Sequence, residues 1–299
     1  MREDFVEQII RTRVERPEAI AEAAARRRRP VAPVDDTGRV MVVAADHPAR
    51  GSLGVGARPL AMADRADLLE RLCVALERPG VTGVLATADI LEDLLLLGVL
   101  DDKVVFGSMN RGGLAGASWE IDDRFTSYDA ETIEAMGFEG GKMLTRVDLD
   151  HPATAPTLEA SSRAVNELAD RRLVAMVEPF MSRLVDGRRK NDLTTEAAIK
   201  ASAIAAGLGR TSAYTWLKVP VVDDMERVAG ASTLPTVLLG GEIREDQDAF
   251  FETWRTALAV PNVIGMVVGR SLLYPADDDV AKAVDAAVGL FPTPAGAAR

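Results

Sequence analysis

The segment Ser212-Ala213-Tyr214-Thr215-Trp216-Leu217-Lys218-Val219-Pro220 is a short run of strand-forming residues with a lysine near its end. Its aromatic, β-branched and leucine side chains suit a buried strand, whereas an ammonium group among them loses hydration, which lowers its pKa. A lysine amine without its proton can attack a carbonyl and form a Schiff base. The alternative is a lysine that extends from the strand end into solvent. The rest of the chain decides between these two interpretations.

This segment is one of eight short apolar runs that follow Arg39 and alternate with amphipathic segments. The predicted strands are 40–45, 83–86, 104–107, 143–147, 173–177, 214–217, 236–239 and 263–268, and the predicted helices are 64–76, 129–136, 157–170, 194–208, 246–258 and 277–290. Eight strand-helix units in about 260 residues are typical of a closed (β/α)₈ barrel, a TIM barrel of the α/β class. An open doubly wound sheet is the alternative, but the glycine-rich dinucleotide fingerprint does not follow the first run.

The first 38 residues predict an N-terminal helical extension, which precedes a barrel catalytic domain at 39–299. Apolar residues recur at helical spacing between Phe5 and Val14, and a second helix is predicted over 17–29. Four arginines, 26–29, close that helix, and we interpret them as a solvated face that complements the helix dipole. We expect a homo-oligomer, in which the N-terminal helices and exposed apolar positions such as Trp254 mediate self-association.

The composition excludes several classes of partner and site. A net charge of -11 and a pI near 4.9 argue against nucleic acid or an anionic membrane as the main partner. A single cysteine, Cys73, excludes an internal disulfide framework and fits a reducing compartment. Because no apolar run reaches the length of a membrane span and the first residues do not resemble a signal peptide, we predict a cytoplasmic location.

Only two histidines are present, His47 and His151, and they stand in different segments. Zinc catalysis usually needs two or three imidazoles on one metal, so we predict no metal and no cofactor. A magnesium site remains an alternative, because Mg²⁺ needs few protein ligands and Glu178 with Asp148 or Asp150 could supply carboxylates.

In a barrel the active site lies where the strands end, and polar residues follow most of the predicted strands. Lys218 would be the Schiff-base lysine, Glu178 and Asp46 would carry protons, and Lys142 or Arg146 would lower the pKa of Lys218 by like-charge repulsion. Glycines at strand ends would let backbone N–H groups approach a phosphate. The predicted substrate- or phosphate-binding residues are His47, Asn110, Arg146, Gly240, Gly241, Gly269, Arg270 and Ser271.

Each assignment has a simpler alternative. Glu178 could be a surface acid paired with an arginine, Asp46 could be a turn residue before Pro48, and His47 could satisfy backbone groups at a strand end. The strand-end glycines could serve tight turns. The joint location of these residues at strand ends favours the catalytic interpretation.

The set resembles the class I, Schiff-base-forming aldolases of the (β/α)₈ type, the group of archaeal-type fructose-bisphosphate, tagatose-bisphosphate and deoxyribose-phosphate aldolases. The resemblance rests on Asp46-His47, Leu217-Lys218-Val219, Leu239-Gly240-Gly241 and Val268-Gly269-Arg270-Ser271. It implies that Lys218 is the Schiff-base lysine, Asp46 the acid after the first strand and Glu178 the proton shuttle. It also implies that Lys142 is the additional lysine of the tagatose-bisphosphate branch and that the glycines bind phosphate with Arg270.

The implied activity is metal-independent cleavage or formation of a carbon-carbon bond in a phosphorylated sugar or keto-acid, in sugar or inositol breakdown. Two features depart from the family: Glu242 places an acid beside the expected phosphate site, and the loop 108–128 matches no bisphosphate-sugar pattern and could cover the site. The alternatives are a magnesium-dependent lyase barrel and a non-catalytic barrel that binds a sugar phosphate.

Overall fold

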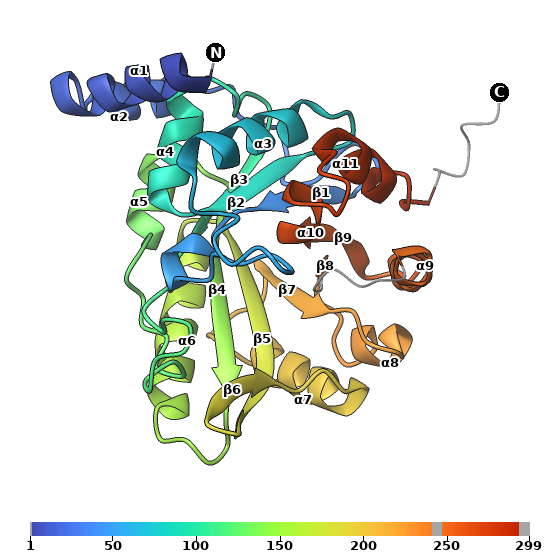
Figure 1. The fold of residues 1–299 in the computed structure, drawn as a ribbon. Coiled ribbons are helices and arrows are strands. Elements are labelled where there is room, and N and C mark those ends of the chain that lie inside the picture. Colours follow the sequence, from blue (N-terminus) through green and yellow to red (C-terminus); the bar gives the residue numbers. More distant parts are fainter. Residues whose placement is uncertain (1, 241–246, 293–299) are drawn as a thin grey trace.

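Eight parallel strands close into a TIM barrel in the computed structural model, which describes residues 2–240 and 247–292 (Figure 1). The strands run around the barrel in the order β4, β3, β2, β1, β9, β8, β7 and β5, and pairing between β4 and β5 completes the circle. This architecture confirms the predicted fold. The bounds are β1 (Val40–Ala44), β2 (Gly83–Ala86), β3 (Val104–Ser108), β4 (Gly140–Val147), β5 (Val174–Val185), β7 (Thr215–Pro220), β8 (Thr236–Leu239) and β9 (Val263–Val268).

Helices alternate with the strands and cover the outside of the barrel (Figure 1). Those that follow the strands are α3 (Arg65–Glu77), α4 (Ala88–Leu96), α5 (Ala130–Ala135), α6 (Thr154–Asp170), α7 (Thr195–Ala206), α8 (Met225–Ala229), α9 (Gln247–Leu258), α10 (Arg270–Leu273) and α11 (Val280–Val288), with a short 3₁₀ helix η1 (Pro48–Arg50) after β1. The sequence predicts no helix at α4, because its run of leucines hides the helical period. It also misses α8 and α10, each only about one turn long.

The centre of the barrel is an apolar layer made by alternate residues of seven strands. Its members are Val40, Val42, Ala44, Leu85, Val104, Phe106, Val174, Met176, Trp216, Val237 and Val267. Successive side chains of a strand point to opposite faces, so the next inward positions are Asp46 beyond β1, Ser108 on β3, Glu178 on β5 and Lys218 on β7. An ionic layer therefore rests directly on the apolar one.

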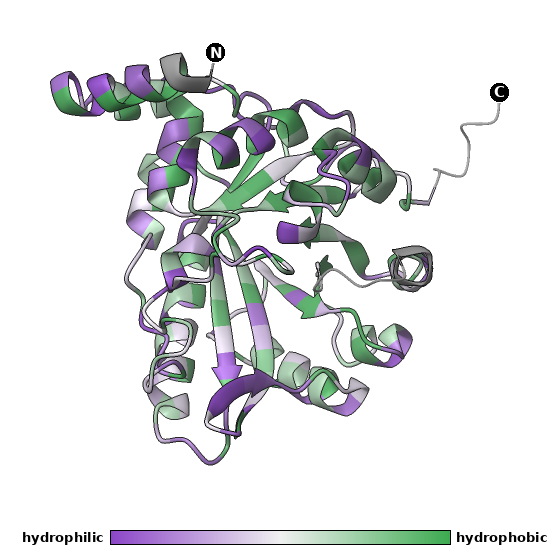
Figure 2. Cartoon of the chain, viewed as in Figure 1, coloured by the Kyte–Doolittle hydropathy of each residue, from purple (hydrophilic) through white to green (hydrophobic). Residues whose placement is uncertain are grey.

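A hairpin extends β5 beyond the barrel, and the sequence-based strand prediction ends before it. β5 pairs antiparallel with β6 (Arg188–Asn191) across the two-residue turn Asp186-Gly187, in which both residues have positive φ. Asp-Gly between two strands is a strong hairpin signal, so this element was within reach of the sequence. Strand β6 is strongly hydrophilic (Figure 2), and its Arg189 pairs with Asp148 just after β4.

Helices α1 (Arg2–Glu15) and α2 (Ala19–Arg26) lie against the barrel's helices, α1 on α3 and α2 on α4 (Figure 1). The interpretation of the four arginines as a solvated face is wrong for Arg27. Because α2 ends at Arg26, the Arg27 side chain turns inward, where it donates to the Lys103 carbonyl at 2.7 Å and pairs with Glu139 at 2.9 Å. Only 2% of the Arg27 side chain is exposed, and the guanidinium also lies over the Phe138 ring.

The predicted exposure of Trp254 is also wrong. Its side chain is fully buried in α9 and stacks at a tilt on Phe251, with 6.3 Å between the ring centroids. Trp254 therefore packs the α9 layer onto the barrel and offers no surface for self-association.

Within the described residues, no helix is long and apolar enough to span a membrane.

Replacing Arg27 with methionine is expected to lower the free energy of unfolding by about 1–3 kcal/mol, because the buried Glu139 carboxylate keeps only Arg29 and the Val105 N–H as partners and the Lys103 carbonyl loses its donor. Urea unfolding followed by circular dichroism measures this. Arg28→Met is the matched control: its partners Asp101 and Asp102 are exposed, so little or no change in stability is expected. Equal losses in the two variants would contradict the anchoring role of Arg27.

Candidate active site

Five ionisable side chains from five different segments form one continuous chain of close contacts above the apolar layer. Lys218 Nζ lies 3.0 Å from Glu178 Oε1, and the other oxygen of Glu178 contacts Lys142 Nζ. Lys142 Nζ also lies 3.2 Å from Asp46 Oδ2, which pairs with the Arg111 guanidinium. None of the five residues is more than 8% exposed. The structure thus brings together all four predicted catalytic residues and adds Arg111.

Burial and mutual charge set the protonation of these groups. Burial lowers the pKa of Lys218 and lowers that of Lys142 strongly, and the positive charge of Arg111 acts in the same direction on both. Burial alone would raise the pKa of Glu178, but Lys142 and Lys218 outweigh it and lower this pKa. The site therefore combines a permanently ionised carboxylate with amines that lose a proton readily.

Arg111 is the residue that sequence reasoning missed. It stands three residues beyond the last residue of β3, and its Nε donates to Ser108 Oγ at 3.2 Å, while Ser108 Oγ donates to Asp46 Oδ2 at 3.2 Å. Burial lowers the pKa of Arg111 to about 10, which still leaves it charged at neutral pH. Its position just after a strand is a sequence signal for a site residue, but the sequence analysis selects the neighbouring Asn110 in this loop.

The loop from Met109 to Tyr128 is firmly attached to the barrel. Arg50 and Arg146 both donate to Glu120 Oε1, at 2.9 and 2.7 Å, so two arginines from separate strand ends hold one loop carboxylate. The Asn110 amide also faces the barrel, accepting from the Leu144 N–H at 2.7 Å. The structure thus places Asn110 and Arg146, two predicted binding residues, in contacts that fix this loop over β4.

The remaining predicted binding residues lie around β1, β8 and β9. His47 Nδ1 is 3.7 Å from Asp46 Oδ1, and burial together with Arg270, Lys218 and Lys142 lowers the pKa of this imidazole, which is therefore neutral. Gly240 and Gly269 follow β8 and β9, and Arg270 Nη1 donates to the Gly54 carbonyl at 3.3 Å.

Close packing explains both glycines. A Cβ on Gly269 would lie 2.4 Å from the Ala44 carbonyl, and one on Gly240 would lie 2.6 Å from Val268 Cγ1. The Ser271 hydroxyl is buried and has no hydrogen-bond partner among the described residues. Gly241 and Glu242 fall outside the described residues.

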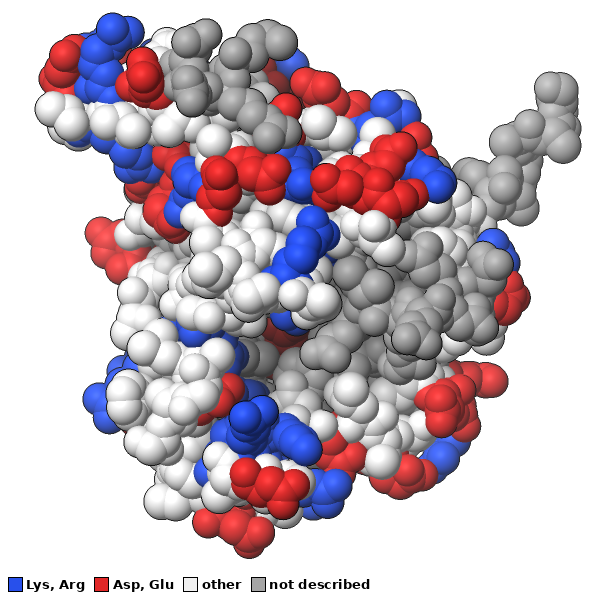
Figure 3. Space-filling model, viewed as in Figure 1, with Lys and Arg blue, Asp and Glu red and all other residues white. Residues whose placement is uncertain are grey.

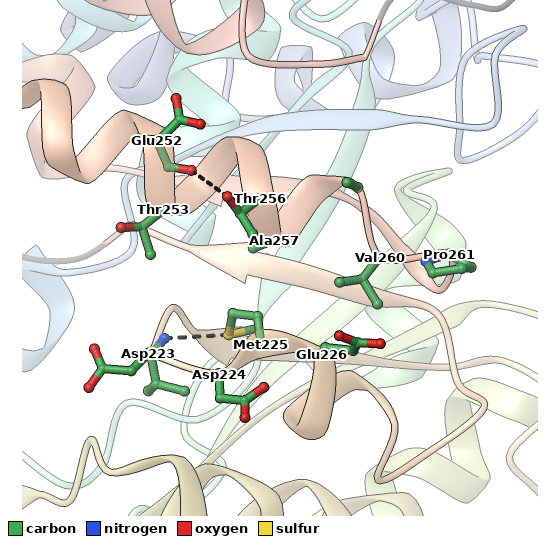
Figure 4. A pocket seen from close by; sticks show the side chains of 12 residues that line it. Asp223, Asp224, Met225, Glu226, Glu252, Thr253, Thr256, Ala257, Val260 and Pro261 are labelled. Carbon is green, nitrogen blue, oxygen red and sulfur yellow. Dashed lines mark hydrogen bonds between the residues drawn. The ribbon is translucent and has the colours of Figure 1, made fainter.

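A hollow opens near the middle of the face shown in Figure 3, and both basic and acidic side chains reach its margin. A separate cavity of about 700 Å³ lies between α8 and α9 (Figure 4). Its lining includes Asp223, Asp224, Glu226 and Glu252, and none of the five residues of the ionic cluster contributes to it. This cavity is therefore distinct from the strand-end site.

The carboxylates considered for magnesium are engaged elsewhere. Glu178 contacts two lysines, and Asp148 pairs with Arg189 of the β5–β6 hairpin and accepts from the Asp150 N–H at 3.0 Å. Within residues 2–240 and 247–292, no group of three or more His, Cys, Asp or Glu side chains is arranged to hold a metal ion. Glu178 and Asp148 are thus both paired with basic side chains.

Comparison with known proteins gives a family and a fold. The family model described as Cgl0159-like matches residues 38–288. The crystal structure of Cgl0159 from Corynebacterium glutamicum is 53% identical, with 96% of each chain covered and a TM-score of 0.93. A comparison with curated proteins found no significant match.

Two aldolases share the fold at low identity. An archaeal fructose-1,6-bisphosphate aldolase, solved with its catalytic lysine covalently bound to the carbinolamine intermediate, is 17% identical, with a TM-score of 0.62 over 91% of this chain and 98% of that chain. Fructose-bisphosphate aldolase from Slackia heliotrinireducens is 15% identical, with a TM-score of 0.61 over 84% and 86%. Similarity at this level shows a common barrel.

Proposed function

The chain belongs to the Cgl0159-like family, and from its buried ionic cluster we propose that it is a class I aldolase that works through a Schiff base on Lys218. The observation that carries the proposal is the contact of Lys218 and Lys142 with the two oxygens of one buried carboxylate, Glu178. A purely structural ion pair would need one lysine. Burial and the charge of Arg111 lower the pKa of both lysines, which favours a free, nucleophilic amine beside a carboxylate that can carry protons.

The residues divide the proposed reaction among them. The Lys218 amine adds to the substrate carbonyl, and Glu178, 3.0 Å away, moves the protons as the carbinolamine loses water to give the iminium ion. A carboxylate then removes the proton of the substrate hydroxyl, the carbon-carbon bond breaks, and its electron pair flows into the iminium to form an enamine. Protonation of the enamine and hydrolysis release the second product and the free lysine.

Lys142 and Asp46 complete the proposed site. Lys142 bridges Asp46 and Glu178, so its charge stabilises both carboxylates in their ionised, basic form. Asp46, which also contacts Lys142, is the second proton carrier. The fold shared with an aldolase whose catalytic lysine forms a carbinolamine supports this division of roles.

The proposed substrate is a phosphorylated sugar or keto-acid. Arg270 and the unpartnered hydroxyl of Ser271 stand with Gly240 and Gly269 after β8 and β9, where barrels often bind phosphate. His47 lies between this group and Asp46, and as a neutral imidazole it can donate to or accept from a substrate hydroxyl.

Trapping of the Schiff base tests the proposal. The protein is incubated with dihydroxyacetone phosphate and pooled sugar phosphates in the presence of borohydride, and intact mass and peptide mapping follow. An adduct confined to Lys218 is expected, and its mass identifies the carbonyl fragment. Unchanged mass with every compound, or an adduct spread over surface lysines, would overturn the proposal.

A further inference from the structure

The ionic cluster holds more positive than negative groups. Lys142, Lys218 and Arg111 can carry three positive charges, and Asp46 and Glu178 can carry two negative charges. With every group ionised the cluster would have an uncompensated positive charge in a place where no member is more than 8% exposed. Burial of an unpaired charge is unfavourable, so the favoured state is the one in which a single cation has lost its proton.

The contacts decide which cation that is. Arginine keeps its proton in proteins. Lys142 Nζ contacts two carboxylates, Asp46 and Glu178, whereas Lys218 Nζ contacts Glu178 alone among the described residues. Burial lowers the pKa of Lys142 more strongly than that of Lys218, but a neutral Lys142 would weaken ion pairs with two carboxylates, whereas a neutral Lys218 weakens only one. The contacts therefore favour Lys218 as the neutral amine.

We propose that Arg111 is a positioning residue that acts through Asp46: by occupying this carboxylate it forces Lys142 and Lys218 to share Glu178, and so leaves Lys218 uncharged and nucleophilic. This inference rests on the proposed function. Without Arg111, two lysines would face two carboxylates, the charges would balance, and Lys218 would keep its proton. The guanidinium thus sets the reactivity of an amine to which it makes no direct contact.

Other groups around Lys218 do not alter this balance. His47, after β1, is neutral because burial and the surrounding cations lower its pKa. Arg270, on α10, acts on His47 and bonds to the Gly54 carbonyl. The described strand β8, which pairs with β7, carries no ionisable side chain. Arg146 and Asp123 influence Arg111, but Arg146 is neutralised by Glu120.

The test is the pH dependence of Lys218 labelling by pyridoxal 5′-phosphate with borohydride reduction, quantified by peptide mapping between pH 6 and 10. The labelling rate rises with pH as Lys218 loses its proton. For Arg111→Gln, this rise is expected to occur about one pH unit or more higher than in the wild type, so that labelling at lower pH is about tenfold slower. Labelling at the highest pH should reach the wild-type rate, which a merely disordered site would not do. Arg111→Lys restores the charge and should restore the wild-type pH dependence.

Arg50→Gln is the matched control, because Arg50 holds the same loop through Glu120 but contacts none of the cluster. In Arg50→Gln, the labelling of Lys218 should rise at the same pH as in the wild type. An unshifted pH dependence in Arg111→Gln, or an equal shift in Arg50→Gln, would overturn the role of Arg111 while leaving the aldolase proposal intact. Absence of Lys218 labelling in the wild type below pH 9 would overturn it too. Failure of the aldolase itself is recognised separately, by the absence of sugar-phosphate adducts.

Discussion

Replacing Lys218 with methionine is expected to lower kcat by a factor on the order of 10⁴ or more and to abolish the trapped adduct at every pH, because the proposed reaction passes through a Schiff base on this amine. Methionine has a similar length and suits a buried strand, so the fold should persist: Trp216 and the apolar layer lie directly beneath. Turnover of the phosphorylated substrate found by trapping is the measurement, with circular dichroism to verify folding.

The Lys142→Met variant distinguishes the proposed nucleophile, Lys218, from the lysine beside it. It also removes one of the three cations, so labelling of Lys218 should require a higher pH, but an adduct should still form there. An adduct at Lys142 in the Lys218→Met protein would reverse the assignment of the two lysines. Full turnover by Lys218→Met without an adduct on either lysine would exclude Schiff-base chemistry.

Replacing Glu178 with glutamine is the second large effect, with kcat expected to fall by about 10²–10⁴-fold, because the amide cannot carry protons during dehydration and bond cleavage. The pH dependence should move in a specific direction. Glu178 raises the pKa of Lys218, so its removal lowers that pKa further, and the free amine persists to lower pH. Glu178→Gln should therefore turn over slowly, while the labelling of its Lys218 should begin to rise at a lower pH than in the wild type.

This displacement is opposite in sign to that expected for Arg111→Gln, since one variant removes a negative and the other a positive charge from the same cluster. Measuring both profiles with the same reagent gives an internal check on the electrostatic argument. Parallel shifts in the two variants would show that loss of packing, and not charge, controls Lys218. Full activity of Glu178→Gln would assign the proton transfers to another group, with Asp46 the nearest candidate.

The sequence predicts the barrel well because short apolar runs and amphipathic helices alternate regularly, and because one face of each strand must fill the interior. The same two-residue period brings Asp46, Glu178 and Lys218 to one layer: each is the first ionisable residue after an apolar run on the inward face. Lys142 fits this pattern too, on a strand that begins with two glycines.

What the sequence does not reveal depends on contacts between distant segments. Arg111 reaches Asp46 across 65 positions, and Arg27 reaches Glu139 across 112, and no local period marks either pairing. The sequence does not show that Trp254 is buried, because it does not reveal which side of its helix packs against the barrel. The Asp186-Gly187 turn, by contrast, was a local signal that could have been used.

The ionic layer draws its members from positions 46, 111, 142, 178 and 218, so no contiguous half of the chain contains the whole set. The pair Lys142–Glu178 joins the adjacent strands β4 and β5, and Arg111, after β3, pairs with Asp46, after β1. Under the proposed function, the reactivity of Lys218 would therefore arise only after the barrel has closed. In a partly folded chain the same lysine would be solvated and would keep an ordinary pKa.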